Sequence, residues 1–273
     1  MQRFFDIVFS GMALILLSPL LLPLMVTLRV TGEGEIFFPQ SRVGRGGKDF
    51  KLYKFATMLK NSPNMGTGTV TVKNDPRVLP MGGFLRKTKI NELPQLINIF
   101  NGDMSVIGPR PQTQRCFDAF PLSSQSEIIK VRPGLSGIGS IIFRNEEDMM
   151  YANNDPDKFY DEIVMPYKGS LEEWYVSHQN IVSFFSLIGL TIWVVLGFSS
   201  GLVWKLFKDL PSPPEELDKF VKNPEWYYRT VILKQPFTST QEVKDGKNFT
   251  VSKLSPFPQD TSGEIISLWG ISD

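Results

Sequence analysis

Two long runs of apolar residues stand out along the chain. The first, residues 7–28, contains 22 residues without a charge and lies between Asp6 and Arg29. A straight helix of that length would measure roughly 33 Å, enough to cross the hydrocarbon core of a bilayer. The second run, residues 181–204, is uncharged over 24 residues. Both runs are therefore candidate membrane segments.

The first run is interrupted near its centre by Ser18-Pro19, with Pro23 four residues later. Pro19 lacks the amide that would bond the Ile15 carbonyl, so a kink is expected, and the Ser18 hydroxyl can bond back to its own helix. Basic residues lie at both ends, which gives the positive-inside bias no reason to separate them. We predict that residues 1–30 form a re-entrant helix-break-helix; a kinked span is the alternative.

Charges on either side of the second run argue against a simple span. Acidic residues precede it, and Lys205 and Lys208 follow it. This order would place its near end outside, in conflict with an intracellular catalytic region upstream. We therefore predict that residues 181–208 form an interfacial or membrane-associated helix, with Trp193 and Trp204 as headgroup anchors. Burial of this helix in the protein core is the alternative.

Between these runs, residues 31–180 have the short alternating patterns of a mixed α/β domain that is small and compact. Glycines and polar residues at 44–49 predict a hairpin turn between strands at 36–38 and 50–53. No periodic βαβ series is present, so no Rossmann sheet is expected. After Asp209 the composition becomes rich in proline. Residues 209–273 are predicted to be an appendage that wraps the core or is partly disordered.

Composition narrows the chemistry. The 273 residues are 42% hydrophobic and 21% charged, which is ordinary for a globular protein. Twenty-nine basic and 28 acidic residues leave a formal charge of +1, so no nucleic-acid partner is expected. The single cysteine, Cys116, and single histidine, His178, exclude an internal disulfide and the usual zinc sites. Carboxylates, cations and an oxygen-preferring metal such as Mg²⁺ remain.

The densest group of such residues lies at 82–111. Asn91 is expected to cap a helix whose first turn contains Glu92 and Pro94, because proline is tolerated there. A helix start offers free amides to a phosphate, and Glu92 is the predicted Mg²⁺ ligand. The alternative of equal weight is a helix cap followed by a favourable first-turn acid. Arg86, which precedes this helix among lysines, is predicted to bind phosphate.

Further candidates follow this helix. Asp103 comes directly after a glycine stop. Arg110 stands between Pro109 and Pro111, whose restricted backbone would hold the guanidinium ready for a phosphate. A structural salt bridge is the alternative for Arg110. Arg144 follows a glycine-rich turn and is either a further phosphate ligand or a solvated surface charge.

Together these motifs resemble those of the bacterial sugar transferases, the monotopic polyprenyl-phosphate phosphoglycosyl transferases, over roughly residues 2–205. The matching segments are Phe5-Asp6-Ile7, Ser18-Pro19, 37–44, Tyr53-Lys54-Phe55-Ala56-Thr57-Met58, Asn74-Asp75-Pro76-Arg77, Leu85-Arg86-Lys87-Thr88, Glu92-Leu93-Pro94-Gln95-Leu96, 102–111 and Arg132-Pro133-Gly134.

The resemblance implies a re-entrant helix in the bacterial inner membrane and a catalytic face in the cytoplasm. It also implies Mg²⁺-dependent transfer of a phosphosugar from a nucleotide diphosphate sugar, usually a UDP-sugar, to undecaprenyl phosphate. Such a transfer starts a surface glycan: exopolysaccharide, capsule, O-antigen or glycoprotein. A second copy of the chain and downstream glycosyltransferases are the candidate protein partners.

In the resembled family an aspartate beside the glutamate attacks the sugar-linked phosphate. Here Asn91 stands in place of that aspartate, and Ala56 stands where the family usually has arginine. One hypothesis is a divergent active enzyme, in which Glu92 or Asp103 is the nucleophile or the lipid phosphate attacks directly. The other is a catalytically weak membrane subunit that acts with a partner enzyme.

Overall fold

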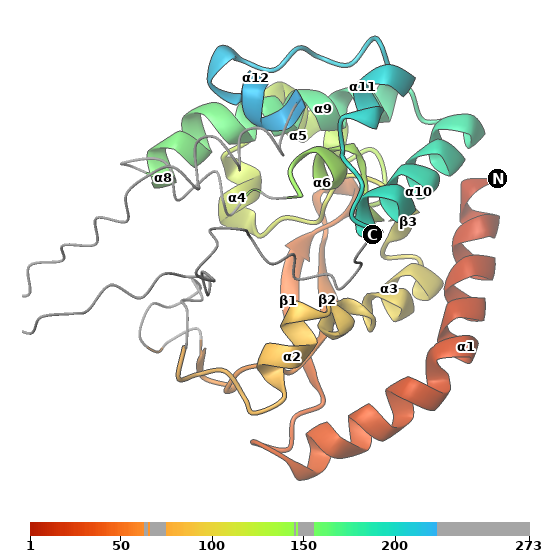
Figure 1. Ribbon diagram of the computed structural model, residues 1–273, viewed down its shortest axis with the longest axis vertical. Helices are drawn as coiled ribbons and strands as arrows, with labels where there is room; N and C mark the ends of the chain where they lie inside the picture. The colour runs from red at the N-terminus through yellow and green to blue at the C-terminus, as the bar shows by residue number, and fades with distance from the viewer. Residues whose placement is uncertain (63–64, 66–74, 145, 147–155, 223–273) are drawn as a thin grey trace, which may run out of the picture. The chain divides into compact units, whose positions relative to one another are not determined.

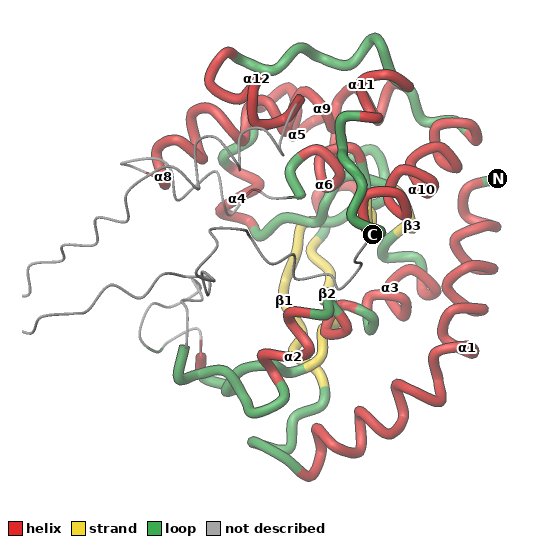
Figure 2. Tube along the Cα trace, viewed as in Figure 1, coloured by secondary structure: helices red, strands yellow, loops and turns green. Residues whose placement is uncertain are grey.

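The computed structural model describes residues 1–62, 65, 75–144, 146 and 156–222 (Figure 1). These residues belong to one compact unit, Met1–Gln235. Asn74, Asn145 and most of the predicted appendage, residues 223–273, lie outside the described residues. The described part is a mixed helix and sheet structure, as predicted, and helices make up more of it than strands (Figure 2).

The first apolar run forms one long helix, α1 (Gln2–Val30), which includes Pro19 and Pro23. The helix changes direction partway along its length (Figure 1). Ser18 Oγ donates a hydrogen bond to the Ile15 carbonyl at 2.7 Å, which is the carbonyl that Pro19 leaves without an amide partner. The expected back-bonding is thus confirmed, but the predicted break is a bend within a continuous helix. By length and composition α1 could cross a membrane.

The first two turns of α1 are fixed to the rest of the unit by buried polar contacts. Asp6 is 1% exposed, and its Oδ1 accepts hydrogen bonds from Ser105 Oγ at 2.8 Å and from the Val106 amide at 2.9 Å. Gln2 Nε2 donates to Ser105 Oγ and to the Ile107 carbonyl. These acceptors and donors belong to strand β3 (Ser105–Ile107). The N-terminal end of the apolar helix is therefore bonded directly to a central strand.

Two small sheets of two strands each lie at the centre of the described part. β1 (Phe37–Val43) and β2 (Asp49–Phe55) form an antiparallel hairpin with Phe37 opposite Phe55 and Val43 opposite Asp49. The connecting turn, η1 (Arg45–Gly47), has Gly46 at φ 71° and Gly47 at φ 70°, values that glycine adopts without strain. The predicted hairpin is confirmed. β3 pairs in parallel with β4 (Gly134–Ser136).

Helices surround these sheets. In chain order they are α2 (Gly82–Lys87), η3 (Ile90–Glu92), α3 (Gln95–Asn101), α4 (Gln114–Asp118), α5 (Leu122–Ile128), α6 (Ile138–Ile142), α8 (Pro156–Phe159), η4 (Tyr160–Val164), α9 (Met165–Ser177), α10 (Ile181–Val195), α11 (Leu202–Leu206) and α12 (Glu215–Lys222). The longest of them after α1 are α9 and α10. α1 packs against α3, and α3 packs against β2.

The second apolar run is not one helix. α10 begins with a capping box at Asn180 and ends at Val195, and the chain becomes helical again only at α11. One face of α10 is buried in the largest hydrophobic cluster through residues such as Phe184 and Leu187, while Val182 is 70% exposed. Trp204, a predicted headgroup anchor, donates its indole N–H to the Val221 carbonyl at 3.4 Å. Core burial therefore accounts for one face of α10 and leaves its other face open.

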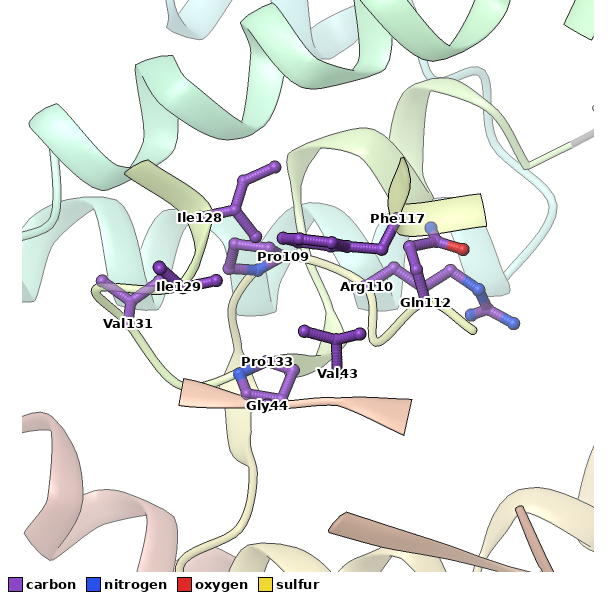
Figure 3. Close-up of a pocket in the computed structure, with 10 residues that line it drawn as sticks. All are labelled: Val43, Gly44, Pro109, Arg110, Gln112, Phe117, Ile128, Ile129, Val131 and Pro133. Carbon is purple, nitrogen blue, oxygen red and sulfur yellow. The ribbon is translucent and has the colours of Figure 1, made fainter. Parts of the chain in front are cut away.

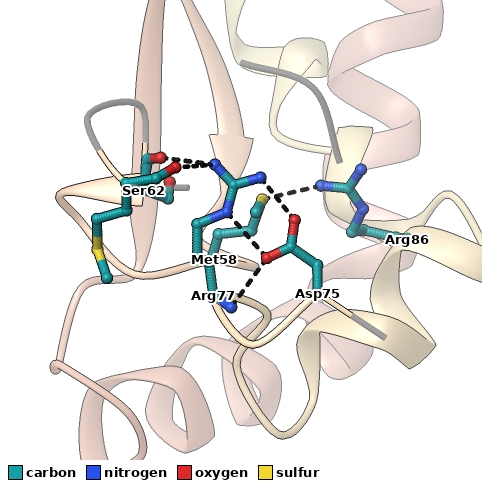
Figure 4. Close-up of polar contacts among 6 residues, drawn as sticks. Met58, Ser62, Asp75, Arg77 and Arg86 are labelled. Atoms are coloured by element: carbon teal, nitrogen blue, oxygen red, sulfur yellow. Dashed lines mark hydrogen bonds and ion pairs between the residues drawn. The ribbon is translucent and has the colours of Figure 1, made fainter. Parts of the chain in front are cut away.

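The segment before α2 is organised by a buried ion pair (Figure 4). Arg77 donates through Nε and a terminal nitrogen to Asp75 at 2.9 and 2.6 Å. Its other terminal nitrogen donates to the carbonyls of Ser62 and Met65, each at 2.8 Å. One guanidinium thus joins the chain after β2 to the chain that leads into α2.

The Asp6 contacts predict a specific loss of stability. Asp6→Ala removes the acceptor of two hydrogen bonds and leaves buried donors on β3, so we expect the free energy of unfolding to fall by about 2 kcal/mol. Thermal unfolding of the purified full chain in detergent, followed by circular dichroism, measures the change.

Ser10→Ala is the matched control for this change. Ser10 is equally buried, but its hydroxyl bonds only carbonyls of its own helix, so its loss should lower the melting temperature much less. Equal shifts in the two variants would contradict the anchoring role of Asp6.

Candidate active site

Glu92 lies at a tight turn between two helices. It ends η3, and the residue before η3, Lys89, has φ 60°, the left-handed conformation that side-chain-bearing residues seldom adopt. Backbone hydrogen bonds from the Lys89 amide to Arg86 and from the Glu92 amide to Lys89 close the turn. Strained backbone of this kind is often found at functional sites. The turn projects Glu92 toward the β1–β2 hairpin.

Three cations from three other segments surround the Glu92 carboxylate. Lys54 Nζ, on β2, lies 3.2 Å from Glu92 Oε1, and a terminal nitrogen of Arg110 lies 3.9 Å from the same atom. The side chains of Lys54 and Glu92 are 19% and 22% exposed, whereas Arg110 is 47% exposed. Arg42, on β1, is close enough to Arg110 and Glu92 for its charge to act on both. The cluster therefore carries more positive than negative charge.

The pKa values of both members of the Lys54–Glu92 pair are lowered, which favours the charged form of Glu92 and the neutral form of Lys54. Burial tends to raise the pKa of the Glu92 carboxyl, but Lys54 and Arg110 outweigh it and hold that pKa below its ordinary value. Burial lowers the pKa of the Lys54 ammonium, and the attraction of Glu92 does not offset burial together with repulsion from Arg110. Glu92 is therefore ionised at neutral pH. A bound anion would relieve the remaining excess of positive charge.

Asn91 does not cap the helix, contrary to the prediction. It lies inside η3, and α3 begins only at Gln95, without a side-chain cap. The reason is that the turn from Lys89 continues as a 3₁₀ turn to Glu92, and Pro94 then starts the next helix. Asn91 Oδ1 is buried and has no hydrogen-bond partner within the described residues. Such an atom in a native structure calls for an explanation, and a bound ligand is one.

The amides expected to bind a phosphate at this helix start are largely occupied. Those of Glu92 and Leu93 donate to the carbonyls of Lys89 and Ile90, and those of Leu96 and Ile97 donate to Leu93 and Pro94. α3 itself has only seven residues. The side-chain cations, rather than a helix start, provide the anion-binding character of this site.

Arg110 is held from behind by its neighbours in the chain. Pro109 and Pro111 are buried, and the Pro109 carbonyl accepts the Gly134 amide at 2.8 Å. A Cβ at Gly108 would lie 2.5 Å from the Arg132 carbonyl, so only glycine permits this close approach. The two prolines therefore fix the backbone of Arg110 and leave its side chain free to reach Glu92.

A small cavity lies behind this segment (Figure 3). Its lining includes Pro109, Phe117 and Pro133, and its volume of about 10 Å³ holds roughly one water molecule. It is too small for a nucleotide sugar. The accessible part of this segment is the exposed side chain of Arg110.

Three other predicted residues lie apart from this cluster or have other partners. Arg86, in the last turn of α2, has a terminal nitrogen 3.3 Å from Met58 Sδ (Figure 4). Arg144 donates to the Val194 carbonyl near the end of α10. Asp103 follows the far end of α3, about 10 Å of helix from Glu92, and accepts a hydrogen bond from Asn98. Among the predicted catalytic acids, only Glu92 joins the cations.

Lys54 and Arg42 were missed as site residues, although a sequence signal for them exists. In the hairpin register Lys54 lies opposite Phe38 and Arg42 lies opposite Phe50, so both occupy the same face of the two strands. Side chains alternate between the two faces of a strand, so charged residues at alternate positions of paired strands predict a shared charged face. That inference needs the register, which the sequence alone leaves open.

The site and fold together place a cluster of cations suited to a phosphate-bearing ligand in the same unit as a long apolar helix. The chain belongs to the family described as bacterial sugar transferase, whose sequence model matches residues 1–198. The recognition made from the motifs is thereby confirmed.

Individual relatives support this assignment. The chain is 36% identical over 165 residues to the exopolysaccharide production protein ExoY of Rhizobium meliloti, covering 55% of this chain and 72% of that protein. It is 36% identical over 153 residues to the UDP-glucose:undecaprenyl-phosphate glucose-1-phosphate transferase of Escherichia coli, covering 55% of this chain and 33% of that protein. It is 32% identical over 210 residues to the undecaprenyl-phosphate galactose phosphotransferase of Salmonella typhimurium, covering 72% of this chain and 40% of that protein. The chain thus spans less than half of the latter two relatives.

The Glu92 pair predicts a pH-dependent stability. Because the pKa of Glu92 is lower in the folded than in the unfolded protein, its stabilisation is complete above the unfolded value of about 4.3 and is lost as pH falls through the folded value. We expect Glu92→Gln to unfold more easily than the wild type by about 1 kcal/mol from pH 5 to 7. This gap should close below about pH 4. Thermal unfolding across this pH range measures it.

Glu216→Gln serves as the control, since Glu216 is exposed in the first turn of α12. It should unfold like the wild type throughout. A constant gap for Glu92→Gln down to pH 3 would contradict the assigned ionisation.

Proposed function

We propose that this protein transfers a sugar phosphate from a UDP-sugar to undecaprenyl phosphate, the first step in building a surface glycan. The observation that carries the proposal is the cluster of Lys54, Arg110 and Arg42 around the ionised Glu92. Relatives named for this type of transfer support it.

The cations suit the charge of a pyrophosphate. A nucleotide diphosphate sugar brings two phosphate charges, which match the excess positive charge left by a single carboxylate among three cations. Arg110 is the most exposed of the three and can fork onto one phosphate, while Lys54 supplies a buried point charge. As the bond to the leaving nucleotide breaks, these groups stabilise the negative charge that develops on it.

Two routes fit a site in which Asn91 replaces the family's nucleophile. In the first, a Glu92 carboxylate oxygen attacks the sugar-linked phosphorus, forming an acyl phosphate and releasing UMP; undecaprenyl phosphate then attacks that phosphorus and restores the carboxylate. In the second, a phosphate oxygen of undecaprenyl phosphate attacks the donor directly and displaces UMP. Only the first route releases UMP before the lipid is added.

Magnesium belongs to the proposal as a cofactor shared with the substrate. No group of three His, Cys, Asp or Glu side chains suited to a metal occurs in the described ranges of the chain. Glu92 and the unpartnered Asn91 Oδ1 are oxygen donors on consecutive residues, which fits an ion held jointly with donor phosphates. Bound there, Mg²⁺ would neutralise part of the pyrophosphate charge.

The exposed apolar surface supports a membrane placement. Ile15 and Leu16 on α1 are 74% and 71% exposed, and Val195 on α10 is 66% exposed. Contact with lipid would remove these side chains from water. We propose that α1 is re-entrant and that the site faces the cytoplasm at the bacterial inner membrane, where a soluble donor meets a lipid acceptor. A second copy of the chain and downstream glycosyltransferases are the proposed protein partners.

The decisive measurement is UMP release by the purified full chain. We expect release when the chain is incubated with Mg²⁺, undecaprenyl phosphate and a panel containing UDP-glucose, UDP-galactose and their N-acetylamino forms. Glu92→Gln should lower the rate about 100-fold or more. Removal of Mg²⁺ with EDTA should abolish release, and added Mg²⁺ should restore it. No release with any donor would refute the proposal, and release without the lipid would select the covalent route.

Asn91 also supports a second candidate function, a catalytically weak subunit that acts with a partner enzyme. A neutral amide is a poor nucleophile, and Asn91→Asp restores the family's carboxylate in the same volume. If the chain is a weak subunit, this substitution should raise UMP release at least about tenfold. If it is an active enzyme by either route above, wild-type turnover is robust and Asn91→Asp changes it less than about threefold.

Asn101→Asp is the matched control, because Asn101 is exposed at the end of α3 and receives the same charge. It should leave UMP release unchanged. An equal rise in both variants would show a general effect of charge and would remove the support for the weak-subunit reading.

A further inference from the structure

A second concave site opens at the start of α1. It is a cavity of about 220 Å³, more than enough for a phosphate group, and its lining includes Arg3, Arg45, Lys130, Arg132 and Asp6. These residues come from α1, the hairpin turn η1 and the loop that precedes β4. Three segments distant in sequence thus bring four cations to one cavity.

The charge of this cavity is only partly balanced. Asp6 is its one acidic lining residue, and that carboxylate already accepts hydrogen bonds from Ser105 and Val106. Lys130 forms an ion pair with Glu127. The remaining arginines leave an excess of positive charge facing the cavity, so an anion would be attracted there.

Two of the arginines are each held by one hydrogen bond from their own Nε. Arg45 Nε donates to the Lys130 carbonyl at 3.1 Å, and Arg132 Nε donates to the Gly102 carbonyl at 2.8 Å. Each bond orients its guanidinium and uses one of five N–H donors. Arg3 differs, because both of its terminal nitrogens donate to the carbonyls of Ile99 and Phe100. Arg45 and Arg132 are therefore the two side chains oriented to fork onto an oxyanion.

The cavity is separate from the candidate active site. Arg132 bonds to Gly102, directly after the C-terminal end of α3, whereas Glu92 precedes the start of that helix. Seven helical residues correspond to about 10 Å. The donor phosphates proposed to bind near Glu92 do not account for the cations of this cavity.

The surface beside the cavity is apolar. Phe4 follows Arg3 in the chain and is 65% exposed, and Ile7 and Val8 follow Asp6 and are 41% and 40% exposed. A ligand with both phosphate and hydrocarbon would satisfy both surfaces, since the phosphate can enter the cavity while acyl chains cover the apolar side of α1. We propose that this cavity binds the phosphate of an anionic phospholipid headgroup. The proposal rests on the membrane placement of α1 proposed above, and it does not depend on catalysis.

Binding of short-chain lipids to the full chain in nonionic detergent tests the proposal. We expect dioctanoyl phosphatidic acid to raise the melting temperature in a saturable manner, and the zwitterionic dioctanoyl phosphatidylcholine to have little effect. Arg45→Gln and Arg132→Gln should each weaken the apparent affinity for phosphatidic acid about tenfold, the loss of one charge-assisted contact. Lys51→Gln removes an exposed cation of β2 and should bind as the wild type does.

Further measurements distinguish binding of lipid from binding of soluble phosphate, and a loss of binding from a loss of folding. Inorganic phosphate that binds as tightly as phosphatidic acid would overturn the lipid assignment. Arg132→Lys keeps the charge and should recover part of the affinity even if Arg132→Gln is unstable. Unchanged affinity for phosphatidic acid in Arg45→Gln and Arg132→Gln, or no binding by the wild type, would overturn the site. No donor is present in these measurements, so an inactive protein still gives a clear result.

Discussion

The buried carboxylate of Asp6 connects the apolar helix α1 to the strand that leads to the candidate active site. It bonds Ser105 and Val106 at the start of β3, and five residues after Ser105 the same chain reaches Arg110. Arg110 contacts Glu92, so a short covalent path joins the end of the apolar helix to the candidate active site. Under the proposed function the site receives one substrate from solution and another from lipid, so it needs such a fixed relation to the apolar helix. Hydrogen bonds at a buried carboxylate fix the position of the helix more strictly than apolar packing would, because they are directional.

An excess of positive charge is the second organising feature. Lys54, Arg110 and Arg42 crowd around a single carboxylate. Lys54 and Arg110 lower the pKa of Glu92 against the effect of burial, whereas burial and repulsion from Arg110 lower the pKa of Lys54. Folding has gathered cations that repel one another, which costs free energy unless an anion is present. The arrangement is reasonable for a site whose ligand carries a pyrophosphate. It also explains why Glu92 stays ionised despite being mostly buried.

Asn91 lies in a well-formed turn, but its neutral amide is a poor nucleophile. Its neighbour Lys89 holds a left-handed turn, Glu92 is correctly placed, and the buried oxygen of Asn91 is left without a partner in the described residues. The turn is therefore formed with Asn91 at the position where the resemblance implies an aspartate nucleophile. Under the proposed function, either Glu92 or the lipid phosphate takes over the attack, or the chain relies on a partner.

Much of this could be seen in the sequence because it depends on local order. The length of the apolar run, the Ser18 hydrogen bond beside Pro19 and the glycine turn of the hairpin all follow from neighbours along the chain. The sequence also marked Glu92 and Arg110 as candidates, and these two side chains lie in contact. The sequence also established the family. It could not place Lys54 and Arg42 beside Glu92, because strand register and the packing of β2 against α3 decide that. It misplaced the helix start, since a 3₁₀ turn competed with the Asn91 cap, and it grouped Asp103 with Glu92 although a helix separates them. Charges distant in sequence act together only when tertiary contacts bring them within a few ångströms, and those contacts are what the structure alone decided.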